Sequence, residues 1–370
     1  MSEAGRRELE SVVRSLIKVN LGVKEDETLL LLGDKGDDVM DPRLALDVGE
    51  CLELIHPGTT TVIFPSTGRS GIEPPEQVWE ASFGRETVQR FRRSGLLKRL
   101  IEKTASEEDI RAAGEMVSPA DAVDTVVALA FNSTSHTSFR KLLTMWGKAR
   151  YASMPHFLRD MFFGSMNVDW RALANSTQAL ARALEGVNSL EIHAGNGTNL
   201  ELDVSERPFK TDDGDLTKPG SFGNLPAGEV FVAPLEGTTE GTLVIEWGPS
   251  LKLAAPMKVF VEKGRAVSVS GENPDDVRWI EGLFSAHPDN NNVAELGIGT
   301  NPGATRPDSI LESEKILGTV HLAFGDNHTF GGNVVAPFHL DFVVYDATLT
   351  GLWKQGGGRR VLLSDGKPGW

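Results

Sequence analysis

The stretch VHLAFGDNHTFGGNVVAPFHLD, residues 320–341, contains His321, His328 and His339, three of the eight histidines in the chain, and it ends on Asp341. Side chains two positions apart on a β-strand point to the same face, so His339 and Asp341 can bind one common ion. Imidazole and carboxylate groups together are the usual ligands of catalytic transition metals. The histidines of a strand–loop–strand can also be ordinary polar loop residues. Three of them beside an aspartate on the same face nevertheless favour a metal site.

The whole chain has the composition of a folded, soluble protein and too many residues for one ordinary core. It has 370 residues, of which 40% are hydrophobic and 24% charged, so we expect two domains. The net charge of −15 argues against a nucleic-acid partner. We find no signal-peptide pattern and no apolar run long enough to span a bilayer, which predicts a cytoplasmic protein without a membrane partner. Cys51 is the only cysteine, so no internal disulfide can form, and its apolar helical surroundings predict a buried thiol.

The first half of the chain alternates helical patterns with short apolar runs that are typical of buried parallel strands. We expect helices between strands at residues 28–32, 60–64, 126–131 and 150–154. The polar run NSTSHT, residues 132–137, could offer backbone N–H groups to a substrate anion, but a simple helix cap is the better interpretation. No GxGxxG or GxxxxGK[ST] motif follows these strands, which argues against a nucleotide site. Residues 1–186 are therefore predicted to form an α/β N-terminal domain with a mainly parallel sheet.

After residue 186 the chain becomes rich in strand patterns. A Gly-Asn-Gly turn joins two alternating runs, which predicts a hairpin over residues 190–204. One helical pattern covers residues 274–284, and further strands are expected at residues 229–233, 241–247, 258–262 and 266–269. Residues 187–370 are therefore predicted to form an α+β, strand-rich C-terminal domain that binds metal and carries the catalytic site.

A metal centre needs more carboxylates than Asp341 alone, and two glutamates stand alone in apolar runs. Glu229 begins EVFVAP, and Glu295 lies in VAELGIGTNPG. A charge in such a run is costly to bury unless it is paired or metal-bound, so both are candidate ligands. Glu312 and Glu314 in LESEK are weaker candidates, because this segment has the pattern of a solvent-facing helical turn. Asp326 is expected to be a turn residue, with the orientation of a histidine as its alternative role.

Four motifs in order, LPAGEVFVAP, AELGIGTNPG, GTVHLAFGDNHTFGG and HLD, resemble the aminopeptidase T family of thermophilic metallo-aminopeptidases. The resemblance implies an N-terminal α/β domain, a C-terminal domain with two divalent ions (Zn, Co, Mn or Mg) and a homodimer. The family usually has a tyrosine near the metals where this chain has His328, and a histidine can coordinate or donate a hydrogen bond there. The metal ligands implied by the resemblance, with His328 added, are Glu229, Glu295, His321, His328, His339 and Asp341.

The 2,5-dihydroxypyridine dioxygenases resemble the chain more distantly. They share the terminal His-x-Asp and carry a histidine at the position of Glu295, which gives an iron site of two histidines and one carboxylate. They lack acidic or imidazole groups at the positions of Glu229, His321 and His328. The presence of all three in this chain favours the hydrolase family.

The main hypothesis is therefore a metallo-aminopeptidase that removes N-terminal residues from peptides or small amides. Two ions would activate a shared water, Glu229 or Glu295 would accept its proton, and His328 would donate to the oxyanion or the leaving nitrogen. These three are the candidate catalytic residues. The alternatives are a non-haem Fe(II) dioxygenase that opens the ring of a hydroxylated pyridine or similar aromatic, and a non-catalytic metal-binding scaffold. The expected partners are a small peptide or amide substrate and a second copy of the chain.

Overall fold

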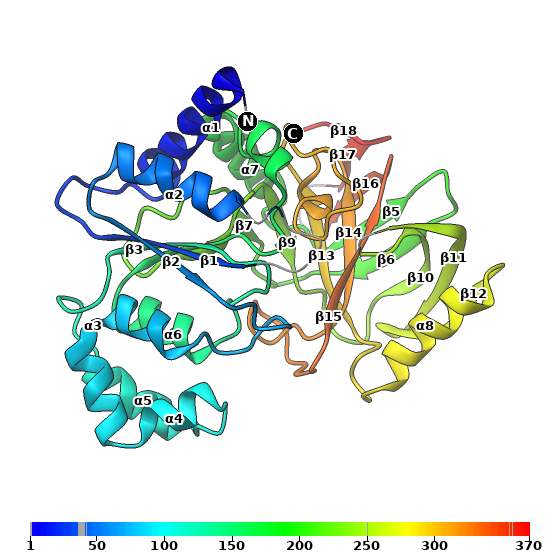
Figure 1. Ribbon diagram of the computed structural model, residues 1–370. Coiled ribbons are helices and arrows are strands. Elements are labelled where there is room, and N and C mark those ends of the chain that lie inside the picture. Colours follow the sequence, from blue (N-terminus) through cyan, green and yellow to red (C-terminus); the bar gives the residue numbers. More distant parts are fainter. Residues whose placement is uncertain (1, 36–40, 42, 250, 355, 357) are drawn as a thin grey trace. The chain divides into compact units, whose positions relative to one another are not determined.

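The computed structural model describes residues 2–35, 41, 43–249, 251–354, 356 and 358–370 (Figure 1). The chain divides into two compact units, Met1–Trp170 with Gly214–Pro226, and Arg171–Asp213 with Ala227–Trp370. This division differs from the single boundary predicted near residue 186, because residues 214–226 return to the first unit and add a strand to its sheet. The two predicted domains, residues 1–186 and 187–370, stay predictions. No helix among the described residues is both long and apolar enough to cross a membrane.

The first unit is built on a parallel sheet with the strand order β2-β1-β3-β4-β8. Its strands are β1 (Leu29–Asp34), β2 (Thr59–Phe64), β3 (Thr125–Leu129), β4 (Arg150–Ser153) and β8 (Phe222–Asn224). Its helices are α1 (Glu3–Ser15), the π-helix η1 (Leu16–Asn20), α2 (Leu44–Ile55), α3 (Glu76–Arg93), α4 (Leu96–Ile101), α5 (Glu107–Met116), α6 (Ser138–Met145) and the 3₁₀ helix η2 (Arg159–Phe163).

Helices cover both faces of this sheet, which explains why its strands are apolar runs rather than alternating ones. Figure 1 shows α1 and α2 on one face and α3 to α6 on the other. Leu30 and Leu32 of β1 are buried in the same core as Trp79 of α3. Leu31 points the other way and lies near Gly49 of α2. The predicted α/β part with a parallel sheet is therefore confirmed.

The polar run after β3 is a capped helix start. The side chain of Thr137 accepts a hydrogen bond from the backbone N–H of Arg140 and caps α6. The carboxylate of Glu73 accepts the N–H groups of Ser138 and Phe139 at 2.6 and 3.0 Å. The chain's own carboxylate thus occupies the N–H groups that a substrate anion would need, and the cap interpretation is confirmed.

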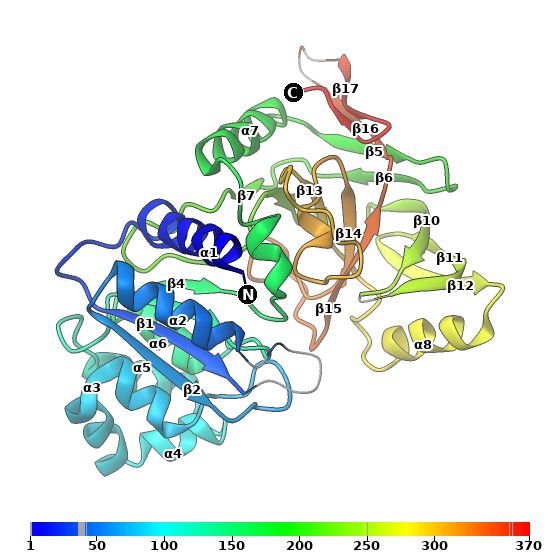
Figure 2. The same cartoon turned by 45° about the horizontal axis from the view of Figure 1, so that its top comes forward.

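The second unit consists mainly of two antiparallel sheets (Figure 2). Its helices are α7 (Trp170–Ala183), α8 (Pro274–Ser285) and the 3₁₀ helix η3 (Ser313–Lys315). The larger sheet has, in spatial order, β12 (Arg265–Gly271), β11 (Lys252–Glu262), β10 (Glu240–Trp247), β6 (Asn199–Asp203), β5 (Ser189–His193), β16 (Thr348–Trp353), β17 (Gly358–Ser364) and β18 (Lys367–Pro368). The smaller sheet has β15 (His339–Val344), β14 (Val320–Gly325), β13 (Val293–Gly299), β9 (Glu229–Val232) and β7 (Lys210–Asp212).

One apolar core joins the two sheets of this unit. Leu200 and Leu243 from the larger sheet belong to the same buried cluster as Leu296 and Leu322 from the smaller one. Alternation then turns residues 295 and 321 of β13 and β14 to the opposite face of the smaller sheet. A strand-rich C-terminal part with antiparallel sheets is confirmed, and the polar face of its smaller sheet carries the candidate site.

Candidate metal centre

The strand register of the smaller sheet gathers the predicted ligands on one face. Residues directly opposite each other in an antiparallel pair point to the same face. Ala323 of β14 pairs on one side with Glu295 of β13 and on the other with Asp341 of β15. His339 lies two residues before Asp341 and points the same way. Three side chains from two non-adjacent strands therefore meet above the small side chain of Ala323.

His321 and Glu229 join this face, and each lies opposite a glycine. Gly297 of β13 pairs with His321, and Gly299 pairs with Glu229 of β9. A Cβ atom at Gly297 would lie 1.9 Å from Nε2 of His321, so the imidazole packs directly against the backbone of β13. A Cβ atom at Gly299 would lie 2.1 Å from the carbonyl oxygen of Ile316, because the segment after η3 approaches the sheet there. A larger residue at Gly297 would fill the space of the His321 ring, and one at Gly299 would collide with the backbone of Lys315 and Ile316.

The ring nitrogens and carboxylate oxygens of these side chains are separated like ligands of a common ion. Nε2 of His321 lies 3.4 Å from Oε1 of Glu295 and 3.5 Å from Oε2 of Glu229. Nε2 of His339 lies 3.6 Å from both Oε2 of Glu295 and Oδ1 of Asp341. These distances are long for hydrogen bonds. Two ligands with bonds of about 2.1 Å to one tetrahedral ion lie about 3.4 Å apart.

Two groups of three donors are compact enough to hold a metal ion. They are Glu229, Glu295 and His321, and Glu314, His321 and Asp341, with the ligand atoms of each group within 4.8 Å of one another. Oε2 of Glu229, Nδ1 of His321 and Oδ1 of Asp341 are buried without a hydrogen-bond partner among the described residues. Buried polar atoms of this kind are costly unless something satisfies them. The donor set therefore fits a divalent cation. The structure holds buried groups of candidate metal-binding residues, and the assignment of each residue as a ligand stays a prediction.

Lys315 and Glu314 belong to this centre. The side chain of Lys315 is 1% exposed, and its Nζ donates to Oε1 of Glu229 at 2.7 Å and to Oε1 of Glu314 at 2.6 Å. The expectation that Glu312 and Glu314 face solvent is wrong. Glu312 is buried and accepts two backbone N–H groups of the preceding loop, while Glu314 is a member of the second donor group.

Burial and the mutual contacts of several carboxylates and histidines shift the pKa values in the centre. Burial raises the pKa of Glu295 and raises that of Glu314 to about 8. Burial alone would lower the pKa of the histidines, but the surrounding carboxylates raise the pKa of His321 to about 9 and that of His339 to about 10. Burial opposes ionisation of Asp341 as well, and His339 outweighs it and lowers the pKa of Asp341. The centre thus stabilises positive charge, as a cation site must.

His328, predicted as a ligand and a catalytic residue, lies outside both donor groups. Its half-exposed ring places Nδ1 2.7 Å from Oδ1 of Asp326. Asp326 has the alternative role considered for it, because its backbone carbonyl accepts Nδ1–H of His339 at 2.8 Å and so orients a candidate ligand. The ring of Phe330 meets His339 edge-on with centroids 5.9 Å apart, and Phe231 lies 5.7 Å from Phe330. The loop between β14 and β15 therefore adds an aromatic surface beside His339.

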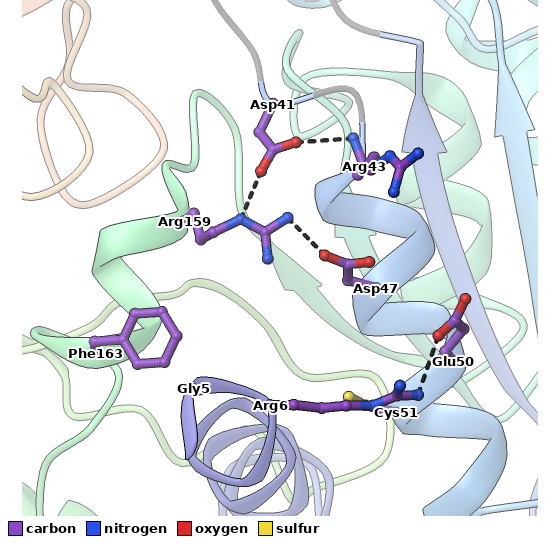
Figure 3. A pocket seen from close by; sticks show the side chains of 9 residues that line it. All are labelled: Gly5, Arg6, Asp41, Arg43, Asp47, Glu50, Cys51, Arg159 and Phe163. Carbon is purple, nitrogen blue, oxygen red and sulfur yellow. Dashed lines mark hydrogen bonds and ion pairs between the residues drawn. The ribbon is translucent and has the colours of Figure 1, made fainter. Parts of the chain in front are cut away.

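The first unit contains a separate cavity of about 490 Å³, in which Arg6 and Arg159 form ion pairs with carboxylates (Figure 3). Nε of Arg159 lies 2.5 Å from Asp41, and its Nη2 lies 2.8 Å from Asp47. Cys51 is buried here, and burial raises the pKa of its thiol, which disfavours a nucleophilic role. The lining residues are Gly5, Arg6, Asp41, Arg43, Asp47, Glu50, Cys51, Arg159 and Phe163. This cavity adds no ligand to the metal centre.

Comparison with protein families gives a match to the family described as NicX: 2,5-dihydroxypyridine 5,6-dioxygenase over residues 165–351, slightly more than half of the chain. The 2,5-dihydroxypyridine 5,6-dioxygenase of Pseudomonas putida strain KT2440 is 24% identical over 175 residues, which are 43% of this chain and 49% of that protein. The chain thus spans about half the length of the curated relative that it matches.

Two solved structures resemble the fold over nearly the whole chain. The 2,5-dihydroxypyridine dioxygenase from Pseudomonas putida KT2440 has a TM-score of 0.69 at 17% identity and covers 100% of this chain and 98% of its own. Wild-type AmpT from Thermus thermophilus has a TM-score of 0.59 at 16% identity and covers 98% of this chain and 99% of its own. At such identities the similarity shows a shared fold and does not distinguish the reactions.

Proposed function

Because this chain belongs to the 2,5-dihydroxypyridine 5,6-dioxygenase family, we propose that it is a metal-dependent dioxygenase that opens the ring of a hydroxylated pyridine or a similar aromatic. The observation that carries the proposal is the extent of the family match. Residues 165–351 include β9, β13, β14 and β15, the strands that bear the candidate ligands. The fold similarity to the Pseudomonas putida dioxygenase supports it.

The expectation of a metallo-aminopeptidase is wrong, and with it the assignment as a hydrolase or protease. It depended on motifs shared with the aminopeptidase T family and on the presence of Glu229, His321 and His328. The matching family and the curated relative are both described as dioxygenases, whereas AmpT resembles this chain in its fold alone. The physical reason for the error is that imidazole and carboxylate ligands serve hydrolytic and oxygen-activating metals alike.

For the metal we propose Fe(II), held by His321, His339 and Asp341. Non-haem iron oxygenases bind iron through two histidines and one carboxylate and leave other positions open. Asp341 lies 3.6 Å from Nε2 of His339, and its ligand atom lies within 4.8 Å of that of His321. The dioxygenases that the chain resembles carry a histidine at the position of Glu295, and here the neighbouring strand supplies His321 instead. When bound, the iron supplies the redox chemistry that lets dioxygen react with the ring.

The chain's own side chains would bind and orient the substrate. Phe231 and Phe330 form an aromatic surface beside His339 that suits a flat ring. Oε2 of Glu295, next to Nε2 of His339, can accept the proton of a ring hydroxyl. Both atoms of one dioxygen enter the product as one carbon–carbon bond of the ring breaks, so no external reductant is required. The catalytic roles expected for Glu229 and His328, and the homodimer, stay predictions.

The proposal is tested with the full chain, loaded with Fe(II) without air and placed in an oxygen electrode. Dihydroxypyridines and catechol are supplied one at a time while the ultraviolet absorbance of the ring is followed. We expect uptake of one dioxygen for each ring consumed by at least one of these compounds, and no uptake by an Asp341→Asn variant. A folded protein that binds iron but consumes neither oxygen nor any of these rings would overturn the proposal.

A further inference from the structure

Lys315 is a cation that the fold buries within the metal centre itself. It ends η3, and the segment that follows η3 lies directly over Gly299 of β13. Its Nζ contacts one oxygen of Glu229 and one of Glu314, at 2.7 and 2.6 Å. A buried ammonium is strongly destabilising without such partners, so these two contacts hold Nζ in place. Neither the family match nor the predicted ligand set assigns this lysine a role.

The two groups of donors are linked at two points. They share His321, and a neutral imidazole has one acceptor nitrogen and therefore binds one ion. They are also joined by Lys315, because Glu229 belongs to the first group and Glu314 to the second. The lysine thus holds one carboxylate oxygen from each group.

We propose that Lys315 is a positioning residue that takes the place of a second metal ion and restricts the centre to one. An ion bound by the same two oxygens would lie about 2.0–2.2 Å from each, in the space that Nζ fills. Lys315 holds Glu229 and Glu314 each through Oε1, whereas Oε2 of Glu229, 3.5 Å from Nε2 of His321, stays among the donors of a single ion. This inference rests on the metal part of the proposed function and not on the ring-opening reaction.

The test is the number of ions bound by the full chain, with Mn(II) as the probe. Elemental analysis counts the ions, and electron paramagnetic resonance separates an isolated Mn(II) from a coupled pair. We expect one isolated ion per chain in the wild type and two coupled ions per chain in Lys315→Met, in which Glu229 and Glu314 are released. The count does not depend on oxygen uptake, so it stands even if the ring-opening proposal fails.

Two control variants separate the charge of Lys315 from its bulk. Lys315→Arg keeps a cation and should keep one ion, and Lys258→Met on the exposed side of β11 should also keep one. The proposal would be overturned by two ions in the wild type. It would also be overturned by one ion in a Lys315→Met variant that circular dichroism and melting show to be folded. If Lys315→Met does not fold, the wild type and Lys315→Arg decide: one ion in each supports the proposal, and two in either overturns it.

Discussion

Gly297 lies directly beneath the imidazole ring of His321, and an alanine in its place should displace that ring. The added methyl group would lie 1.9 Å from Nε2 and 2.1 Å from Cε1 of His321. Ordinary contacts to a Cβ atom begin at 3.4 Å, so the ring would have to withdraw by about 1.5 Å. Ligand distances in metal sites tolerate only about 0.2 Å. A displaced Nε2 therefore no longer binds the ion.

The displacement in Gly297→Ala removes the residue that both donor groups share. We expect metal affinity to fall by at least about 100-fold, since changes to the partners of ligands alone already cost about 10–100-fold. His321 is fully buried, so the forced repacking should also lower the free energy of unfolding by about 1–3 kcal/mol. Calorimetric titration with Mn(II) measures the affinity, and urea unfolding of the metal-free protein measures the stability.

A matched glycine separates this effect from a general effect of alanine. Gly282 lies in α8, and a Cβ atom there would have no heavy atom within 4 Å. Gly282→Ala should keep the wild-type affinity and gain up to about 1 kcal/mol of stability from its better helix propensity. Wild-type affinity in a folded Gly297→Ala variant would refute the assignment of His321 as a ligand.

Two further substitutions test the aromatic surface and a helix cap. Phe330→Ala should raise the KM for the aromatic substrate several-fold without changing the number of bound ions, because the ring of Phe330 lies beside His339 but provides no ligand. An unchanged KM in oxygen-uptake assays would show that Phe330 does not contact the substrate. Hydrogen bonds from Arg99 and from the backbone of Ser106 hold the pKa of Asp109 below its ordinary value of 3.8. The ionised carboxylate therefore stabilises the fold above pH 3.8, and this stabilisation is lost as the pH falls through the lowered pKa. Asp109→Asn should therefore lower the Tm at neutral pH, with a difference that vanishes in acid, and a difference that persists in acid would contradict this linkage.

Simple patterns in the sequence were sufficient to single out most of the side chains that the structure gathers as candidate ligands. Glu229 and Glu295 stood out as single charges in apolar runs, and both lie in buried strands. His339 and Asp341 were predicted to share a face from their spacing of two, and the pairing of β14 with β15 places them so. These predictions depended on strand periodicity and on the cost of burying a charge, which are local properties of the chain.

Other features depended on tertiary packing that no local pattern contains. LESEK is polar enough to predict an exposed turn, but close approach to Gly299 buries Lys315 and places Glu314 among the donors. Likewise, residues 222–224 make a strand too short to recognise, and they join the parallel sheet only because the chain returns to the first unit. The reaction class was beyond reach for a chemical reason, since the same ligand types support hydrolysis and oxygenation.

The central claim is that this metal centre inserts dioxygen into an aromatic ring. Its most direct test is a reaction in which the Fe(II)-loaded full chain and a hydroxylated pyridine are supplied with ¹⁸O₂ in ordinary water, followed by mass spectrometry of the product. The account predicts a ring-opened product that carries two ¹⁸O atoms. A product that takes its new oxygen from water, or a ring that remains intact while the iron is bound, would contradict it.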